Sequence, residues 1–458
     1  MFYNEESNKK VVNPLSSGSI LRIICEMLKQ INKQILFHNE RTAFIALNLA
    51  RHIGLGKDYS LQNIVILSLL HTIGFFRNDT FFSYTDAEEK IDYFSKNHIT
   101  ESKYVFSCYY LEFMTPLKHD ALALENFLQP YDKDMEQYVH QEKIKSILYF
   151  SARISDFIYK NPDSDLPQNL NNIAPNQFNP EIVHSFQQIN RNNTIVSQIK
   201  EKQHLEYLDN YINKITLTDK EKNNYLKLIA YLLDFKSTST MTHSINTSCY
   251  ALALGMRFNL SQADISELFV SAMLHDIGKI CTPQKILEAP GRLSPEEMGI
   301  MRYHVNHSKK ILTDLVPTNI LDDVYRHHEK LNGTGYPNHL TQENLTFIQR
   351  IITVSDITSA LNDSRSYKDE YDADKTLSII KEMTQNNELD SRVVDVLINH
   401  YDDIQKDIKM FQKTLKADFS KIFSNYNDFV FSNLDTLVEK IKPEEIEEIE
   451  ELETLEEL

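Results

Sequence analysis

Apolar residues recur along this chain every three or four positions, the spacing of helices with one buried face. The sequence contains no pair of segments with alternating polar and apolar residues joined by a short turn, so no strand hairpin is predicted. A Gly-containing stretch, residues 332–337, is predicted to be a loop between helices. The pattern therefore predicts an all-α protein. The clearest helical segments are residues 244–256, 264–275, 296–312, 345–361 and 391–404.

The same order of polar and apolar residues occurs twice. HNERTAFIALNL at 38–49 resembles HSINTSCYALAL at 243–254, and LSLLHTIGF at 67–75 resembles VSAMLHDIGK at 270–279. Two more matches follow in the same order, LYFSARISDF with IQRIITVSDI and FNPEIVHSF with LDSRVVDVL. Four matches in one order, all offset by roughly 200 residues, indicate a duplicated helical domain.

The duplication predicts four segments. Residues 17–190 form a first domain, residues 191–221 a linker with a connecting helix, and residues 222–405 a second domain. Residues 406–458 form a charged helical extension that ends in PEEIEEIEELETLEEL. Its apolar residues recur every third position, so the tail is either a solvated acidic helix or an amphipathic partner helix.

Charge and composition narrow the function. The 458-residue chain has a net charge of −17 and lacks the basic surface that grips a nucleic-acid polymer. A small anion can still bind where metals or a few Lys and Arg residues reverse the sign locally. The four cysteines form no CxxC pair and are predicted to be reduced. The start, MFYNEESNKK, is not a signal peptide, and the longest apolar run is too short for a membrane span, so a cytoplasmic location is expected.

The second repeat concentrates side chains that bind metals. Neutral imidazoles and carboxylates are ligands for divalent cations, and an Asp can bridge two cations through its two oxygens. Any single histidine on an apolar helix is more often a hydrogen-bonded core residue, so only the combination points to a metal centre. Lys279 lies one helical turn after the adjacent pair His275-Asp276, where its ammonium could meet a phosphate oxygen. The candidate ligands are His243, His275, Asp276, His304, His327, His328 and Asp356.

These residues lie in strings that resemble a known family. MLHDIGKI, ILEAPGRLSPEE, MRYH, HHEKLNGTGYP and RIITVSDITSALNDSRSYK closely resemble the HD-GYP subgroup of the HD metal-dependent phosphohydrolases, over residues 243–394. The resemblance implies an all-helical HD bundle that uses all seven candidate ligands to hold two divalent ions, iron or manganese, with Asp276 as the bridge. It also implies hydrolysis of cyclic di-GMP to pGpG or GMP by attack of a metal-bound hydroxide.

The resemblance assigns further roles at the substrate. Asp276 and Lys279 are implied to be catalytic. Two positions depart from the family pattern. Ser239 stands where some members carry a Glu ligand, so two ions and not three are expected, and Asn332 stands where an Asp is common. The residues implied to contact substrate are Lys279, the loop residues Gly335, Tyr336 and Pro337, and the basic pair Arg365 and Lys368.

The first repeat retains only part of this set. His38, His71 and Asp156 stand at matching positions, but Thr72 replaces the bridging Asp. The position that matches His304 falls near Tyr104, the position that matches His327-His328 falls near Phe127-Leu128, and no GYP follows. We therefore predict a degenerate HD domain kept for packing, dimerisation or sensing.

Three functions remain open. The full ligand set favours an active cyclic dinucleotide phosphodiesterase. A receptor or scaffold with little turnover, and a hydrolase of another cyclic dinucleotide such as cyclic GMP-AMP, are the alternatives. The GYP loop and the basic pair favour a cyclic dinucleotide but do not choose its bases. The degenerate domain and the C-terminal helices are candidate surfaces for a homodimer.

Overall fold

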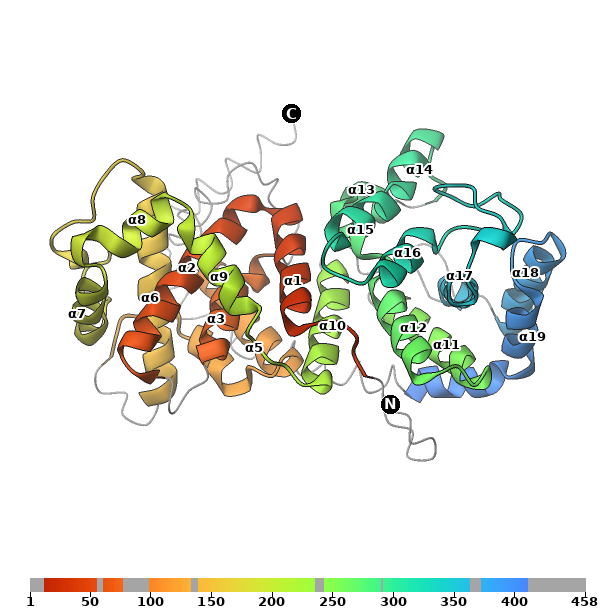
Figure 1. Cartoon of the computed structure of the whole chain (residues 1–458), viewed down its shortest axis with the longest axis horizontal. Helices are drawn as coiled ribbons and strands as arrows, with labels where there is room; N and C mark the ends of the chain where they lie inside the picture. The colour runs from red at the N-terminus through yellow and green to blue at the C-terminus, as the bar shows by residue number, and fades with distance from the viewer. Residues whose placement is uncertain are drawn as a thin grey trace, which may run out of the picture.

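Two helical bundles lie side by side along the long axis of the molecule (Figure 1). The computed structural model describes residues 12–55, 61–76, 99–132, 139–234, 243–289, 291–362 and 372–410. Within these ranges no β-strand forms, and the only bridge of strand type joins Asn332 to Thr341. The prediction of an all-α chain with two tandem bundles, the first degenerate, is confirmed. The exact segment boundaries stay predictions.

The first bundle is capped by its own polar residues. The Ser16 side chain accepts the Ser19 backbone N–H at the start of α1, and Asn32 ends α1 and caps α2 by accepting from Gln34 and Ile35. The elements are α1 (Ser17–Ile31), α2 (Lys33–His52), α3 (Leu61–Leu70), η2 (Ile73–Phe76), α5 (Ile99–Met114), η3 (Lys118–Leu124), α6 (Val139–Lys160), η5 (Leu170–Asn172), α7 (Pro180–Ile189), η6 (Arg191–Asn193), α8 (Thr194–Lys200) and α9 (Gln203–Ile212), where η marks a 3₁₀ turn.

The second bundle repeats this order with additional short helices. Reciprocal capping boxes begin two of its helices, Ser261 with Asp264 and Ser294 with Glu297. The elements are α10 (Asp219–Asp234), α11 (His243–Arg257), α12 (Gln262–Leu274), η7 (Ile277–Cys281), α13 (Gln284–Leu287), α14 (Pro295–Arg302), α15 (His304–Leu312), α16 (Thr318–Arg326), η8 (Gln342–Asn344), α17 (Phe347–Asn362), α18 (Ala373–Gln385) and α19 (Ser391–Asn399).

Two predicted helices are interrupted. The predicted helix 296–312 breaks at Tyr303 into α14 and α15, and the Met301 carbonyl at the break accepts a hydrogen bond from the His304 imidazole. The predicted helix 391–404 is interrupted by a turn at His400 and resumes over 401–410. Helical periodicity survives such breaks, so the sequence pattern did not reveal them.

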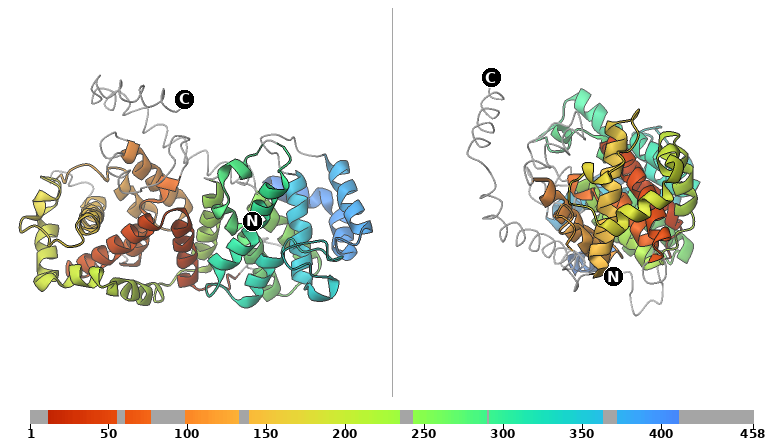
Figure 2. Two further views of the ribbon diagram at one scale, coloured as in Figure 1. Left: turned by 90° about the horizontal axis from the view of Figure 1, so that it is seen from above. Right: turned by 90° about the vertical axis from the view of Figure 1, so that its left-hand side faces the viewer.

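The two bundles join through equivalent helices. α1 of the first repeat packs on α10, which holds the same place in the second. α1 also contacts α15, and α10 contacts α5, the counterpart of α15. Each repeat thus uses the same pair of helices to contact the other, as in the two-fold symmetric interface of a homodimer, but within one chain. Hydrogen bonds tie the junction, from the Leu217 N–H to Ser17 Oγ at 2.8 Å and from the Asn13 amide to Asn223 at 2.9 Å. The left view of Figure 2 shows the bundles meeting at this junction from above.

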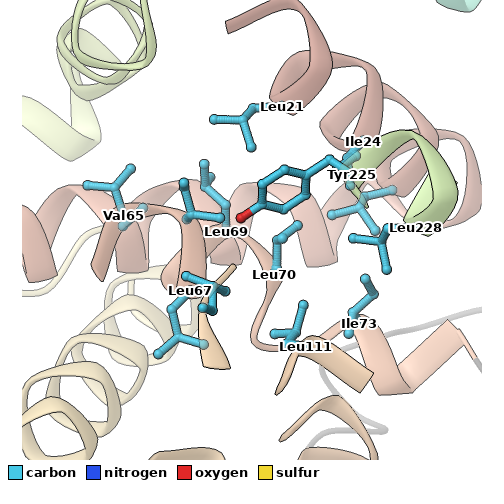
Figure 3. Close-up of a cluster of buried hydrophobic side chains, with 14 of the residues drawn as sticks. Leu21, Ile24, Val65, Leu67, Leu69, Leu70, Ile73, Leu111, Tyr225 and Leu228 are labelled. Atoms are coloured by element: carbon cyan, nitrogen blue, oxygen red, sulfur yellow. The ribbon is translucent and has the colours of Figure 1, made fainter. Parts of the chain in front are cut away.

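The junction is also a hydrophobic core. Tyr225 of α10 is 1% exposed, and its ring lies among Leu21 and Ile24 of α1 and Leu70 of α3 (Figure 3). One continuous cluster of buried apolar residues runs from Leu15 in the first bundle to Val324 in the second. The bundles therefore share this core and are not separate globules on a flexible tether. The second bundle also has an apolar cluster of its own, formed by α11, α12, α17, α18 and α19.

Some predicted features lie outside the described residues, namely the acidic tail, Arg365, Lys368 and Ser239. The four cysteines are free thiols. Among the helices that are described, none has both the length and the apolar character required to cross a bilayer.

Candidate metal centre and substrate cleft

Asp276, directly after α12, lies between two sets of histidines. Its Oδ2 is 3.1 Å from His275 Nε2 and 3.5 Å from His243 Nε2. Its Oδ1 is 3.3 Å from His304 Nε2 and 3.9 Å from His327 Nε2. Each oxygen of one carboxylate thus faces a different set of imidazoles, which is the geometry of a ligand that bridges two ions.

Asp356 and His328 complete the cluster. Asp356, on α17, places Oδ1 2.9 Å from His243 Nε2 and Oδ2 3.5 Å from His328 Nδ1. The ligand atoms form two groups, each with its atoms within 4.8 Å of one another, and Asp276 belongs to both. One group contains His243, His275 and Asp276, and the other contains Asp276, His304, His327 and His328.

The backbone orients three of the imidazoles. His275, His304 and His327 each use Nδ1 to donate to a carbonyl three residues earlier, at 2.7 Å in every case. All three stand at a helix end, where backbone groups lack partners within the helix. With the proton on Nδ1, the lone pair of Nε2 points into the site, as metal ligation requires.

This donor set fits divalent cations. The Nε2 atoms of His304 and His327 lie 3.5 Å apart, and their Nδ1 donors are already engaged, so two lone pairs face each other. Oδ1 of Asp276 is buried without a hydrogen-bond partner among the described atoms. Both features are unfavourable without a cation and favourable with one. The cluster therefore fits two divalent ions that share Asp276.

Burial and the two carboxylates set the charges. Burial lowers the pKa of His304 to about 4 and that of His327 to about 3, so both rings are neutral ligands at pH 7. Burial also lowers the pKa of His275, but Asp276 and Asp356 outweigh it and raise that pKa to about 10. Burial opposes ionisation of Asp276, yet His275 and Lys279 hold its pKa well below its usual range. The proton on His275 thus supplies positive charge beside the two carboxylates, as a bound metal ion would.

Lys279 is held at the centre by a tightly packed turn. Its Nζ lies 2.6 Å from Oδ2 of Asp276. The preceding Gly278 donates its N–H to Ser308 Oγ at 2.8 Å, and a Cβ at Gly278 would lie 2.0 Å from the His304 carbonyl oxygen. Only glycine allows η7 to approach the start of α15 this closely.

The loop after His327-His328 is fixed by a buried carboxylate. Glu329, 0% exposed, accepts the N–H of Asn338 at 2.6 Å and that of Leu340 at 2.9 Å. A Cβ at Gly335 would lie 2.5 Å from Cα of Glu329, so this position also requires glycine. Tyr336 donates its N–H to the His328 carbonyl at 3.1 Å, and its ring lies 4.7 Å from the His328 ring. The loop thereby forms a wall of the metal centre.

Two cavities open on either side of this wall. One, of about 330 Å³, is lined by His243, Asp356, Arg302, Lys330 and Thr353, among others. The other, of about 520 Å³, is lined by Arg292, Met298, Met301 and His304, among others. Both include Lys279, His328 and Tyr336. The centre thus faces a divided cleft with cationic side chains on both sides.

The structure brings all seven candidate ligands together, with Lys279, Gly335 and Tyr336 beside them. Asn332 holds the loop, accepting from Thr334 N–H at 3.1 Å and donating to the Asn386 carbonyl at 2.9 Å. Sequence reasoning missed Arg302, Lys330 and Glu329. Glu329 follows the two histidines directly, and Arg302 lies two residues before His304. Their closeness in sequence to the candidate ligands could have pointed to them.

The first bundle contains a remnant of the centre. His38 and His71 approach through Nε2 at 3.3 Å, and His71 donates from Nδ1 to the Ser68 carbonyl at 2.7 Å. Asp156, however, lies 2.8 Å from Nδ1 of His38 and not from Nε2. Thr72 is bound by the Asn39 amide at 2.8 Å. Among the described residues, both groups that could hold a metal lie in the second bundle.

Aromatic rings fill the space of the missing ligands. The rings of Tyr104 and Phe127 lie 6.0 and 5.9 Å from the His71 ring. A Cβ at Gly74 would lie 2.2 Å from the Lys103 carbonyl oxygen, just as one at Gly278 would meet His304. The residue equivalent to His304 is therefore Lys103, the immediate neighbour of the predicted Tyr104.

Several known proteins are similar to parts of this chain. Residues 227–393 match the family model described as HD domain. The 3'3'-cGAMP-specific phosphodiesterase 3 of Vibrio cholerae is 32% identical over 209 residues, which are 45% of each chain. The cyclic di-GMP phosphodiesterase PA4108 of Pseudomonas aeruginosa is 34% identical over 136 residues, 29% of this chain and 33% of its own. The match thus spans less than half the length of both relatives.

Two similarities extend through both bundles. The 3'3'-cGAMP-specific phosphodiesterase 1 of Vibrio cholerae is 23% identical over 401 residues, 82% of this chain and 90% of its own. The crystal structure of a cyclic GMP-AMP specific phosphodiesterase of V. cholerae superimposes with a TM-score of 0.50 at 19% identity, covering 85% of this chain and 98% of that one. At this identity the structural match shows a common tandem helical fold.

Proposed function

This chain belongs to the HD-GYP family of HD-type phosphohydrolases, and from that membership we propose that its second bundle is a metal-dependent phosphodiesterase that hydrolyses a cyclic dinucleotide. The observation that carries the proposal is Asp276, whose two oxygens face two separate sets of imidazoles. When bound, a pair of divalent ions supplies a nucleophile at neutral pH and stabilises charge on a phosphoryl group. Iron and manganese are the proposed metals, since both accept imidazole and carboxylate ligands.

The protein supplies orientation and charge. The backbone carbonyls that fix Nδ1 of His275, His304 and His327 hold the ligands ready without a change of rotamer. Lys279 balances the charge of Asp276 and lines both cavities. Its ammonium is placed to bind an oxygen of the phosphate under attack and to stabilise the charge that develops there.

The divided cleft supports a substrate with two similar halves. A cyclic dinucleotide has two nucleosides joined by two phosphates, so one nucleoside would enter each cavity while a phosphate lies at the wall between them. Arg302 on one side and Arg292 on the other supply positive charge, whereas Lys330 is paired with Glu388. The Arg302 guanidinium lies 5.3 Å from the Tyr336 ring, a flat pair suited to stacking on a base. Arg365 and Lys368 remain proposed phosphate contacts.

Cyclic di-GMP, cut to pGpG or GMP, is the proposed substrate, and 3'3'-cyclic GMP-AMP is the second candidate. The second candidate is favoured by the relative matched over 90% of its length, which is named as specific for that molecule. Both candidates use the same centre and cleft. They differ in one base, so Arg302 and Arg292 are the side chains proposed to discriminate between them.

The test compares Asp276→Asn with Asp322→Asn. Asp322 is on α16, the helix that presents His327, but is partly exposed and paired with Arg326. Each protein is loaded anaerobically with Fe²⁺ or Mn²⁺, its metal content is measured, and its products from a panel of cyclic dinucleotides are separated chromatographically. Asp276→Asn is expected to lose metal and to lower turnover by on the order of 10³-fold or more, with Asp322→Asn close to the native chain.

The receptor alternative makes the opposite forecast. If the native, metal-loaded chain binds a cyclic dinucleotide but leaves the whole panel intact, the phosphodiesterase proposal fails. Hydrolysis that persists in Asp276→Asn with unchanged metal content would overturn the role of the bridging carboxylate.

A further inference from the structure

The first bundle contains a cavity of its own, of about 830 Å³, larger than either cavity at the metal centre. Helices α2, α6, α8 and α9 of the first bundle form its walls, and α6 and α8 lie towards the outer end of that bundle in Figure 1. The size falls within the range of small-molecule sites. Its described lining residues are Phe37, Arg41, Ile158, Tyr159, Lys160, Pro162, Ile199, Lys200, Lys202, His204 and Leu205.

The cavity is cationic in an acidic protein. Arg41, Lys160, Lys200 and Lys202 line it, and no carboxylate occurs among the described lining residues, although the whole chain carries a net charge of −17. Lys200 has a neutral partner, since its Nζ lies 3.0 Å from the Ser164 carbonyl. Its charge can therefore attract an anion in the cavity.

Flat rings accompany the cations. The Arg41 guanidinium lies 5.4 Å from the Tyr159 ring, and the Phe37 side chain is 40% exposed. His204 Nδ1 is buried without a partner of hydrogen-bond geometry among the described atoms, although the Gln198 backbone lies near the ring. Burial lowers the pKa of His204 to about 4, so the ring is neutral at pH 7. The cavity thus offers stacking surfaces and a polar atom that a ligand could satisfy.

We propose that this cavity binds a small phosphorylated molecule that carries a flat ring, in chemical class a mononucleotide. The ring would lie against Phe37 and the Arg41–Tyr159 pair, and the phosphate would meet Lys200 and Lys202. The apolar walls, which include Ile158 and Leu205, favour such a ligand over phosphate alone. The site needs no metal and lies outside the second bundle, so it stands whether or not that bundle hydrolyses a cyclic dinucleotide.

Calorimetric titration of the full chain in EDTA tests the proposal. GMP and AMP are the probes, and guanosine and inorganic phosphate are the fragments. One mononucleotide is expected to bind per chain, each fragment at least tenfold more weakly. The double variant Lys200→Glu/Lys202→Glu should weaken nucleotide binding at least tenfold, and Phe37→Ala should weaken guanosine and nucleotide but not phosphate.

The matched control is Lys310→Glu/Lys406→Glu, which changes the net charge equally at exposed positions on the second half of the chain. It should bind as the native chain does. Failure of every probe to bind in EDTA would overturn the proposal. Equal weakening by the control pair would also overturn it, because the effect would then be one of overall charge and not of this cavity.

Discussion

At the scale of single residues, the histidines of the second bundle are positioned by the backbone. Each of His275, His304 and His327 donates to a carbonyl in the last turn of the preceding helix, where backbone acceptors are not all used within the helix. The same hydrogen bond thus satisfies the helix end and selects the tautomer. His71 makes the same bond to the Ser68 carbonyl in the first bundle, where no described group of residues could hold a metal.

Gly278→Ala is expected to damage the centre without removing any ligand. The added Cβ would lie 2.0 Å from the His304 carbonyl oxygen, so α15 must shift, at a cost of roughly 1–3 kcal/mol or more in the free energy of unfolding. Metal content and unfolding in urea measure the two effects. Gly299→Ala, where a Cβ meets no heavy atom within 4 Å, is the control and should leave both unchanged or slightly improved. Full metal content in Gly278→Ala would contradict this account.

His71 predicts an acid-sensitive contribution to stability. Burial lowers its pKa from 6.5 to about 3, so between these values the unfolded chain binds a proton that the folded chain does not. Stability then rises with pH, and this contribution is lost as pH falls from about 6.5 towards 3, by up to about 1.4 kcal/mol per pH unit. Urea unfolding at pH 7 and pH 5 should show a smaller pH dependence for His71→Gln. The exposed His400→Gln is the control, and equal slopes in all three proteins would refute the assignment.

At the scale of elements, α10 links the two repeats. It belongs in sequence to the second, yet Tyr225 is buried against α1 and α3 of the first (Figure 3). α1 in turn contacts η7, the turn that carries Lys279. Packing in the first bundle therefore supports the turn of the second bundle that carries Lys279, a residue of the proposed active site.

Tyr225→Ala is expected to lower the free energy of unfolding by about 3–5 kcal/mol, because a large ring in a continuous core is removed. It should also reduce metal content, since α10 contacts η7. Tyr225→Phe keeps the ring and should cost much less. Denaturant unfolding with metal analysis separates the cases, and a Tyr225→Ala protein that loads metal fully would show that α10 does not support the centre.

The sequence predicted helices and repeats better than contacts between distant residues. Helical periodicity and the four repeat matches were enough to predict an all-α tandem fold. The concentration of His and Asp in the second repeat was enough to select candidate ligands that the structure brings together around Asp276. The break at Tyr303 and the Lys103 counterpart of His304 depend on how helices meet, which periodicity does not contain. The cationic cavity was missed because its lining comes from three separated segments that share no motif.

At the scale of the whole molecule, the shared core predicts cooperative unfolding. Buried apolar residues continue from the first bundle into the second, so neither can unfold without exposing the other. Scanning calorimetry of the metal-free chain should show one transition, with equal calorimetric and van't Hoff enthalpies. Two resolved transitions would show that the bundles are independent.

The same core changes how truncation should be interpreted. Deleting residues 1–190 would test a regulatory role for the first bundle, but it would also remove α1 from η7 and α15. Loss of activity in that truncated chain would report lost packing as well as lost regulation. Point substitutions in the full chain, such as those at Lys200 and Lys202, avoid this ambiguity.

The reciprocal packing of α1 and α10 has a consequence for concentration. Two separate copies joined by such an interface would fall apart on dilution, whereas repeats on one chain meet at an effective concentration in the millimolar range. The first bundle therefore stays packed against the second at any concentration of the protein. Because that half never has to be identical to its partner, it can carry Lys103 where the second half carries the candidate ligand His304, with Tyr104 and Phe127 beside His71.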